Sequence, residues 1–123
     1  MNTANLPPQY LHGLTLFNAG EFYECHEVLE GLWQQAAGNE RVLLHALIQA
    51  AAALLHVQRD NLKGAVSIQQ RAHTKLSQLP PIVLQLDTQG FALDLQRFFA
   101  QASPASNQSI PFPKIQLNYD CKT

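Results

Sequence analysis

The segment at residues 40–59 constrains the fold most, because it combines helical spacing with apolar side chains around most of its circumference. Its leucines, isoleucine, valines and the alanine run at 50–53 leave little polar surface. A helix of this kind is typically the central helix of a bundle. Three polar residues nevertheless lie on one stripe of it, namely His45, Gln49 and His56. Because buried polar groups need hydrogen-bond partners, another element has to face this stripe.

The expected partner is the preceding segment, residues 21–37, which is amphipathic. Its apolar residues, among them Cys25, share one broad arc of a helical wheel. His26, Glu27 and Glu30 form a polar ridge beside that arc, because they lie within one turn of one another. Gly31 interrupts the helix and predicts a close approach by a neighbouring element.

A short turn between these two segments predicts an antiparallel pair. In that arrangement Trp33, near the turn, should approach the Leu44 region. Further from the turn, Glu24 and the ridge should approach the polar stripe of the second helix. The sequence therefore predicts a polar cluster between the two central helices.

The rest of the chain adds helices and an irregular end. Proline pairs, Gly20 and Asn61 supply start and stop signals, with Asn61 as an N-cap. The remaining helices are expected at 8–18, 62–79 and 82–102, the last interrupted or kinked near 88–90. An extended tail at 110–119 should pack on the bundle. We therefore predict an all-α fold, a bundle of about five helices in a single domain over 1–123.

Composition excludes several classes of function. The net charge of −1 gives no basic footprint for nucleic acid. The longest uninterrupted apolar run, 50–55, is far shorter than the ~20 residues of a membrane span. Two cysteines are too few for a disulfide framework, and the first residues do not resemble a signal peptide. We therefore expect a cytoplasmic protein that binds neither nucleic acid nor membrane.

Two separated motifs resemble a known family. The first, F-N-x-G-x-[FY]-[FY]-E-x-H-E-x-x-E-x-x-W, runs from Phe17 to Trp33, and the second, L-I-Q-x-A-A-A-x-x-H-x-x-x-x-N-x-x-G-A, runs from Leu47 to Ala65. Together they are similar to the domain of unknown function family DUF309 over about residues 11–79. That resemblance implies a small all-helical protein, labelled a predicted metal-dependent hydrolase without an established activity. The family often has glycine where this chain has Asp60, which bears on the geometry of that turn.

A metal site is the sharpest functional hypothesis. His26, Glu30 and His56 would be the ligands, because imidazole and carboxylate suit zinc, iron or manganese. Glu27 and Glu30 would be the catalytic carboxylates, with a spare glutamate as general base for a water acidified by the metal. The common H-E-x-x-H and paired E-x-x-H spacings are absent from the sequence.

Two non-enzymatic alternatives stay open. The same residues could form a structural polar network that fixes the register of two helices, provided that every member is satisfied. The chain could instead be a binding module, in which Glu24, Trp33, Gln49 and Asn61 line a pocket for a small molecule. A second copy of the chain is the other candidate partner, as a homodimer.

Overall fold

The computed structural model describes residues 6–102 and 111–117. Its helices and strands follow in the order α1 Pro8–Asn18, α2 Phe22–Trp33, α3 Gly38–Gln58, α4 Leu62–Ser77, β1 Ile82–Val83, β2 Leu86–Asp87 and α5 Thr88–Gln101. Helices dominate the described residues, and the strands form one minimal antiparallel hairpin. The predicted all-α bundle of about five helices is confirmed.

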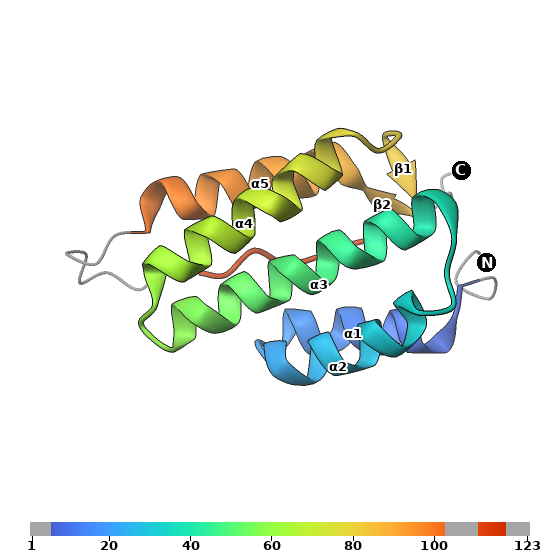
Figure 1. Cartoon of the computed structure of the whole chain (residues 1–123), viewed down its shortest axis with the longest axis horizontal. Helices are drawn as coiled ribbons and strands as arrows, with labels where there is room; N and C mark the ends of the chain where they lie inside the picture. Colours follow the sequence, from blue (N-terminus) through green and yellow to red (C-terminus); the bar gives the residue numbers. More distant parts are fainter. Residues whose placement is uncertain (1–5, 103–110, 118–123) are drawn as a thin grey trace.

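Helix α3 is the centre of the bundle. It packs against α2 on one flank and α4 on the other, and Figure 1 shows it running between them. Its buried residues are Leu43, Leu44, Ala46, Leu47, Ile48, Ala50, Ala51, Ala53 and Leu54. Among the described residues, α3 is the one helix long and apolar enough to cross a membrane, but half of its apolar window is buried inside the protein. The buried half of this window therefore belongs to the core.

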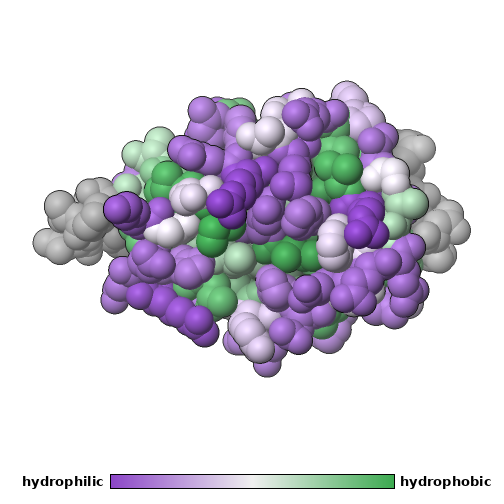
Figure 2. All heavy atoms as spheres, viewed as in Figure 1, coloured by the Kyte–Doolittle hydropathy of each residue, from purple (hydrophilic) through white to green (hydrophobic). Residues whose placement is uncertain are grey.

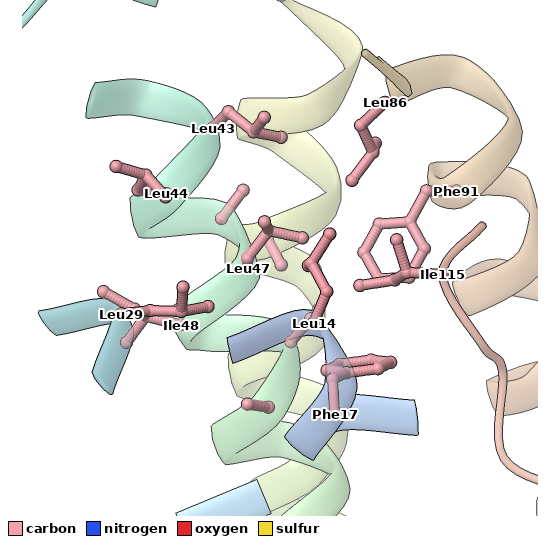
Figure 3. Close-up of a cluster of buried hydrophobic side chains, with 14 of the residues drawn as sticks. Leu14, Phe17, Leu29, Leu43, Leu44, Leu47, Ile48, Leu86, Phe91 and Ile115 are labelled. Atoms are coloured by element: carbon pink, nitrogen blue, oxygen red, sulfur yellow. The ribbon is translucent and has the colours of Figure 1, made fainter. Parts of the chain in front are cut away.

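Side chains from distant parts of the chain meet beside α3. Leu14 and Phe17 of α1, Leu47 of α3, Phe91 of α5 and Ile115 of the C-terminal segment converge in one cluster (Figure 3). The Phe17 ring packs edge-on against Phe91, with centroids 5.7 Å apart. One core thus joins both ends of the described chain.

The close approach in this fold occurs at Gly13 rather than Gly31. A Cβ atom at Gly13 would lie 2.5 Å from Leu29 Cδ2 and 2.8 Å from Leu29 Cγ, so the Leu29 side chain of α2 packs directly on the backbone of α1. Gly31 is exposed, and a Cβ atom there would meet nothing within 4 Å. The prediction for Gly31 was therefore wrong.

The turn between α3 and α4 follows the prediction at Asn61. Its side-chain Oδ1 accepts a hydrogen bond from the Gly64 N–H at 3.1 Å and caps α4. The preceding Asp60 has a φ of 60°, in the left-handed region that favours glycine. That conformation explains why glycine suits this position, and aspartate is among the few other residues that tolerate it.

The prediction of one helix over 82–102 was wrong in its first part. Residues Ile82–Asp87 form the hairpin of β1 and β2 instead, and α5 begins at Thr88. Leu84 and Gln85 turn the hairpin with φ values of 49° and 61°, which a right-handed helix cannot contain. Thr88 is fully buried, and its hydroxyl donates a hydrogen bond to the Pro80 carbonyl at 2.6 Å. This bond fixes the junction between the hairpin and α5.

Helix α2 ends at Trp33, four residues before the expected boundary at 37. The guanidinium of Arg41 explains this end, because it donates hydrogen bonds to the carbonyls of Trp33 and Ala36 at 3.3 and 3.4 Å. The Trp33 carbonyl also accepts the Ala36 N–H at 3.2 Å, so backbone and guanidinium donors together satisfy the end of α2. Helix α3 accordingly starts at Gly38, two residues earlier than expected.

The C-terminal segment 111–117 has no regular secondary structure and packs on the bundle, as predicted for this part of the tail. Ile115 and Leu117 are buried, and Phe112 packs against Phe22 and Phe98. The Asn18 side chain binds the backbone of Ile115 in both directions: its Nδ2 donates to the Ile115 carbonyl at 2.8 Å, and its Oδ1 accepts the Ile115 N–H at 2.7 Å. The rest of the predicted tail, and Cys121 beyond it, lie outside the described residues.

Candidate functional site

Helix α2 presents one cluster of metal-ligating side chains. His26, Glu27 and Glu30 each offer a ligand atom, and these three atoms lie within 4.8 Å of one another. The His26 Nδ1 and Glu30 Oε1 atoms are 3.8 Å apart. No other group of three such side chains meets this criterion in the described part of the chain. The predicted polar ridge therefore exists as a cluster in space.

The local sequence explains where this cluster stands. Phe22, Cys25 and Leu29 fix one face of α2 in the core, so the ridge at His26 and Glu30 lies at the boundary between core and solvent. The His26 side chain is 32% exposed and that of Glu30 46%. Solvent therefore reaches the cluster.

An unusual feature of the cluster is the His26 Nδ1 atom. It is inaccessible to solvent, yet it has no hydrogen-bond partner among residues 6–102 and 111–117. Its distance of 3.8 Å from Glu30 Oε1 is too long for a hydrogen bond. A polar atom in this state is destabilising unless something else binds it.

His56 and Asn61, both singled out from the sequence, bind each other. The Asn61 Nδ2 atom lies 3.0 Å from His56 Nδ1, while the Asn61 Oδ1 atom caps α4. His56 is not part of the group formed by His26, Glu27 and Glu30. Its place in a metal site stays a prediction.

The other predicted pocket residues occupy different surroundings. Gln49 is half-buried, and its Oε1 atom has no hydrogen-bond partner in the part of the chain that the structure describes. Glu24 is exposed on α2 and stands outside the cluster. No hydrogen bond in the described part of the chain joins Gln49 to His26 or His56, so the predicted network between these three residues is not formed there.

Trp33 lies where the antiparallel pairing placed it, beside the first turns of α3. The Arg41 guanidinium carbon is 4.1 Å from the centre of the indole, a cation–π distance. The His45 imidazole also packs against the Trp33 ring, and the centroids of the two rings are 5.2 Å apart. Burial lowers the pKa of His45 below its usual value, and the positive charges of Lys75 and Arg41 lower it further. The imidazole therefore stays neutral to a lower pH than a free histidine.

Sequence reasoning missed a basic surface on α4. Ser67, Gln70, Arg71, Thr74 and Lys75 line an open depression of about 350 Å³. Figure 2 shows mostly hydrophilic residues over this helix. The signal was present in the sequence, because α4 carries basic residues and no acidic one.

Cys25 does not contribute chemistry at neutral pH. It is a free, fully buried thiol, as its place on the apolar arc predicted. Burial raises its pKa from 9.0 to about 12, so the reactive thiolate is not formed in the folded protein.

This shift predicts a specific loss of stability in alkali. Between pH 9 and about 12 the unfolded chain releases the Cys25 proton and the folded chain retains it, so the free energy of unfolding falls as the pH rises. The wild type should lose up to about 1.4 kcal/mol per pH unit more than Cys25→Ala over this interval. Urea unfolding at several pH values, with Cys121→Ser in both proteins, measures the difference. Parallel slopes would contradict the shift.

Comparisons with known proteins identify one family and two similar proteins. The model of DUF309, a domain of unknown function, matches residues 10–68. The crystal structure of a conserved hypothetical protein, TTHA0068 from Thermus thermophilus, is similar with a TM-score of 0.66 and 33% sequence identity, over 76% of this chain and 97% of that one. The uncharacterized protein YpuF of Bacillus subtilis (strain 168) is 38% identical over 61 residues, which are 48% of this chain and 35% of YpuF. The match thus spans about a third of that curated relative.

Proposed function

This chain belongs to the DUF309 family, and we propose that it binds a divalent metal ion through His26 and Glu30, with Glu27 beside them as the general base, and uses the ion in hydrolysis. The observation that carries the proposal is the cluster itself, with three ligand atoms within 4.8 Å. An imidazole and two carboxylates suit zinc, iron or manganese. Two protein ligands leave coordination positions open for water and substrate, and catalytic metal sites need such open positions.

The buried His26 Nδ1 atom supports the same assignment. It lacks a hydrogen-bond partner among the described residues, and a cation held between it and Glu30 would satisfy it. A structural polar network requires every member to be satisfied, whereas here both His26 Nδ1 and Gln49 Oε1 are without a hydrogen bond in the described chain. The metal site accounts for this histidine better than the network does.

His56 has a different role in this proposal. The Asn61 Oδ1 atom accepts the Gly64 N–H, which fixes its Nδ2 as the group that faces His56. Because an amide nitrogen only donates, His56 Nδ1 accepts, and the neutral ring carries its proton on Nε2. We therefore assign His56 to the turn before α4 and not to the metal.

A bound divalent ion would acidify water, which makes it a nucleophile at neutral pH. The exposed Glu27 carboxylate is the group best placed to take up the proton, because it lies within the cluster and reaches solvent. His26 and Glu30 position the reacting water by holding the ion. A small-molecule substrate is part of the proposal, because solvent reaches the cluster.

A cytoplasmic location is part of the proposal. The free thiol of Cys25 and the use of the apolar surface of α3 in the core support it. The homodimer stays a prediction.

Metal content and thermal stability test the site. Protein purified without an affinity tag should contain one equivalent of zinc, iron or manganese by elemental analysis. At 100 times the dissociation constant, a bound ion adds about 2.7 kcal/mol of stability, so a chelator should lower the melting temperature by on the order of 10 °C. Glu30→Gln and His26→Asn should abolish both the metal and the chelator effect.

Glu24→Gln is the matched control, since it removes a carboxylate from the same helix outside the cluster. It should keep the metal and the chelator effect. In Glu27→Gln, metal retained without turnover would assign Glu27 as the general base, and metal lost would assign it as a ligand. Metal-free protein that shows no stabilisation on adding zinc, iron or manganese would overturn the proposal.

A further inference from the structure

The basic depression on α4 has the composition of an anion site. Arg71 and Lys75 supply two positive charges, Ser67 and Thr74 supply hydroxyl groups, and Gln70 supplies an amide. None of these lining residues is acidic. The surface is therefore rich in donors and charged with one sign, although the whole chain has a net charge of −1.

The two positive charges of the depression do not stabilise the fold. Arg71 and Lys75 are four residues apart on α4, so they are neighbours on its surface. Like charges at this spacing destabilise a helix by a few tenths of a kcal/mol. Neither forms an ion pair in the described part of the chain, where the one such contact is between His26 and Glu30.

The positive region continues from α4 to α3. Lys75 and Arg41 act on the same imidazole, that of His45, and both lower its pKa. Arg41 is held in place by its contact with Trp33 and by its bonds to the end of α2. Arg41, held by these contacts, and Lys75, which lines the depression, thus both face the His45 imidazole.

We propose that this depression binds the phosphate group of a small molecule. A guanidinium forms bidentate bonds to phosphate oxygens, and an ammonium and hydroxyl groups add further donors. The two unpaired cations match a phosphate dianion. The site is independent of the metal cluster, because α2 and α4 pack on different flanks of α3 (Figure 1).

The test is a titration of the full chain with inorganic phosphate and with phenyl phosphate at constant ionic strength, followed by NMR. Saturable binding should shift the signals of residues 67–75. It should also raise the pKa of His45, because the anion offsets the charge of Lys75. Arg71→Gln and Lys75→Gln should each weaken binding by about tenfold, as expected for losing one charge-assisted hydrogen bond.

Lys63→Gln is the matched control, because it removes an exposed cation from the same helix outside the depression. It should leave the affinity unchanged. Tighter binding of phenyl phosphate would identify a phosphate ester as the ligand, and equal binding would identify the free ion. Non-saturable shifts, an equal loss in Lys63→Gln, or binding of an RNA oligonucleotide without binding of either small phosphate would overturn the proposal.

Discussion

Replacing Phe17 with alanine should destabilise the protein by about 3–5 kcal/mol, a large share of the stability of a domain this size. Phe17 is 1% exposed. Its ring packs edge-on against Phe22 of α2 at 5.2 Å and Phe91 of α5 at 5.7 Å. The substitution leaves a cavity where α1, α2 and α5 meet, and the fully buried surroundings have little freedom to fill it. Urea unfolding followed by circular dichroism measures the loss.

Phe99→Ala is the control for this experiment. Phe99 lies on α5, is half-buried and packs against Phe98 at 5.1 Å, so part of its surface is already exposed to water. Phe99→Ala should lower the free energy of unfolding by less than half as much as Phe17→Ala, because less apolar area leaves the core. Equal losses would mean that the junction of α1, α2 and α5 is not the centre of the core.

Gly13→Val should destabilise the protein by about 2–3 kcal/mol through overpacking. The new Cβ atom would collide with Leu29, at 2.8 Å from its Cγ. Leu29 is fully buried, and in a close-packed core such a side chain shifts only at a cost. Helices α1 and α2 would have to separate, and the contacts of both helices with the core would weaken. Thermal and urea unfolding both report this change.

The matched substitution is Gly31→Val, which makes the same chemical change on α2. No atom lies within 4 Å of a Cβ at Gly31, and valine is a slightly better helix former than glycine. Its stability should therefore match or slightly exceed that of the wild type. A loss at Gly31 as large as at Gly13 would show that both values reflect helix propensity and not packing between helices.

Local signals predicted the elements that local chemistry determines. The bounds of α1 follow from the proline pair before it and the Asn-Ala-Gly stop after it, and Asn61 caps α4 as expected. The hairpin at Ile82–Asp87 escaped prediction because its apolar residues fit a helical period as well as a strand. Its fixing contact, from Thr88 to the Pro80 carbonyl, depends on a turn that no periodicity reveals.

In the candidate site too, the sequence predicted the local arrangement and not the contacts that depend on a turn. His26, Glu27 and Glu30 come together because they lie within five residues of one helix, where spacing alone gives proximity. The partnership of His56 with Asn61 depends on the left-handed turn at Asp60, and the sequence shows only that a turn occurs there. The surface at Arg71 and Lys75 was open to prediction, since the absence of acidic residues from α4 is visible in the sequence.

The bonds between Asn18 and Ile115 join residues 97 positions apart. Such a contact forms late in folding, because closing a long loop costs entropy before the contact repays it. During synthesis the Phe22 ring has no Phe112 partner until translation has reached residue 112. The nascent protein therefore carries an open aromatic surface over that interval, and transiently exposed apolar surface of this kind favours aggregation.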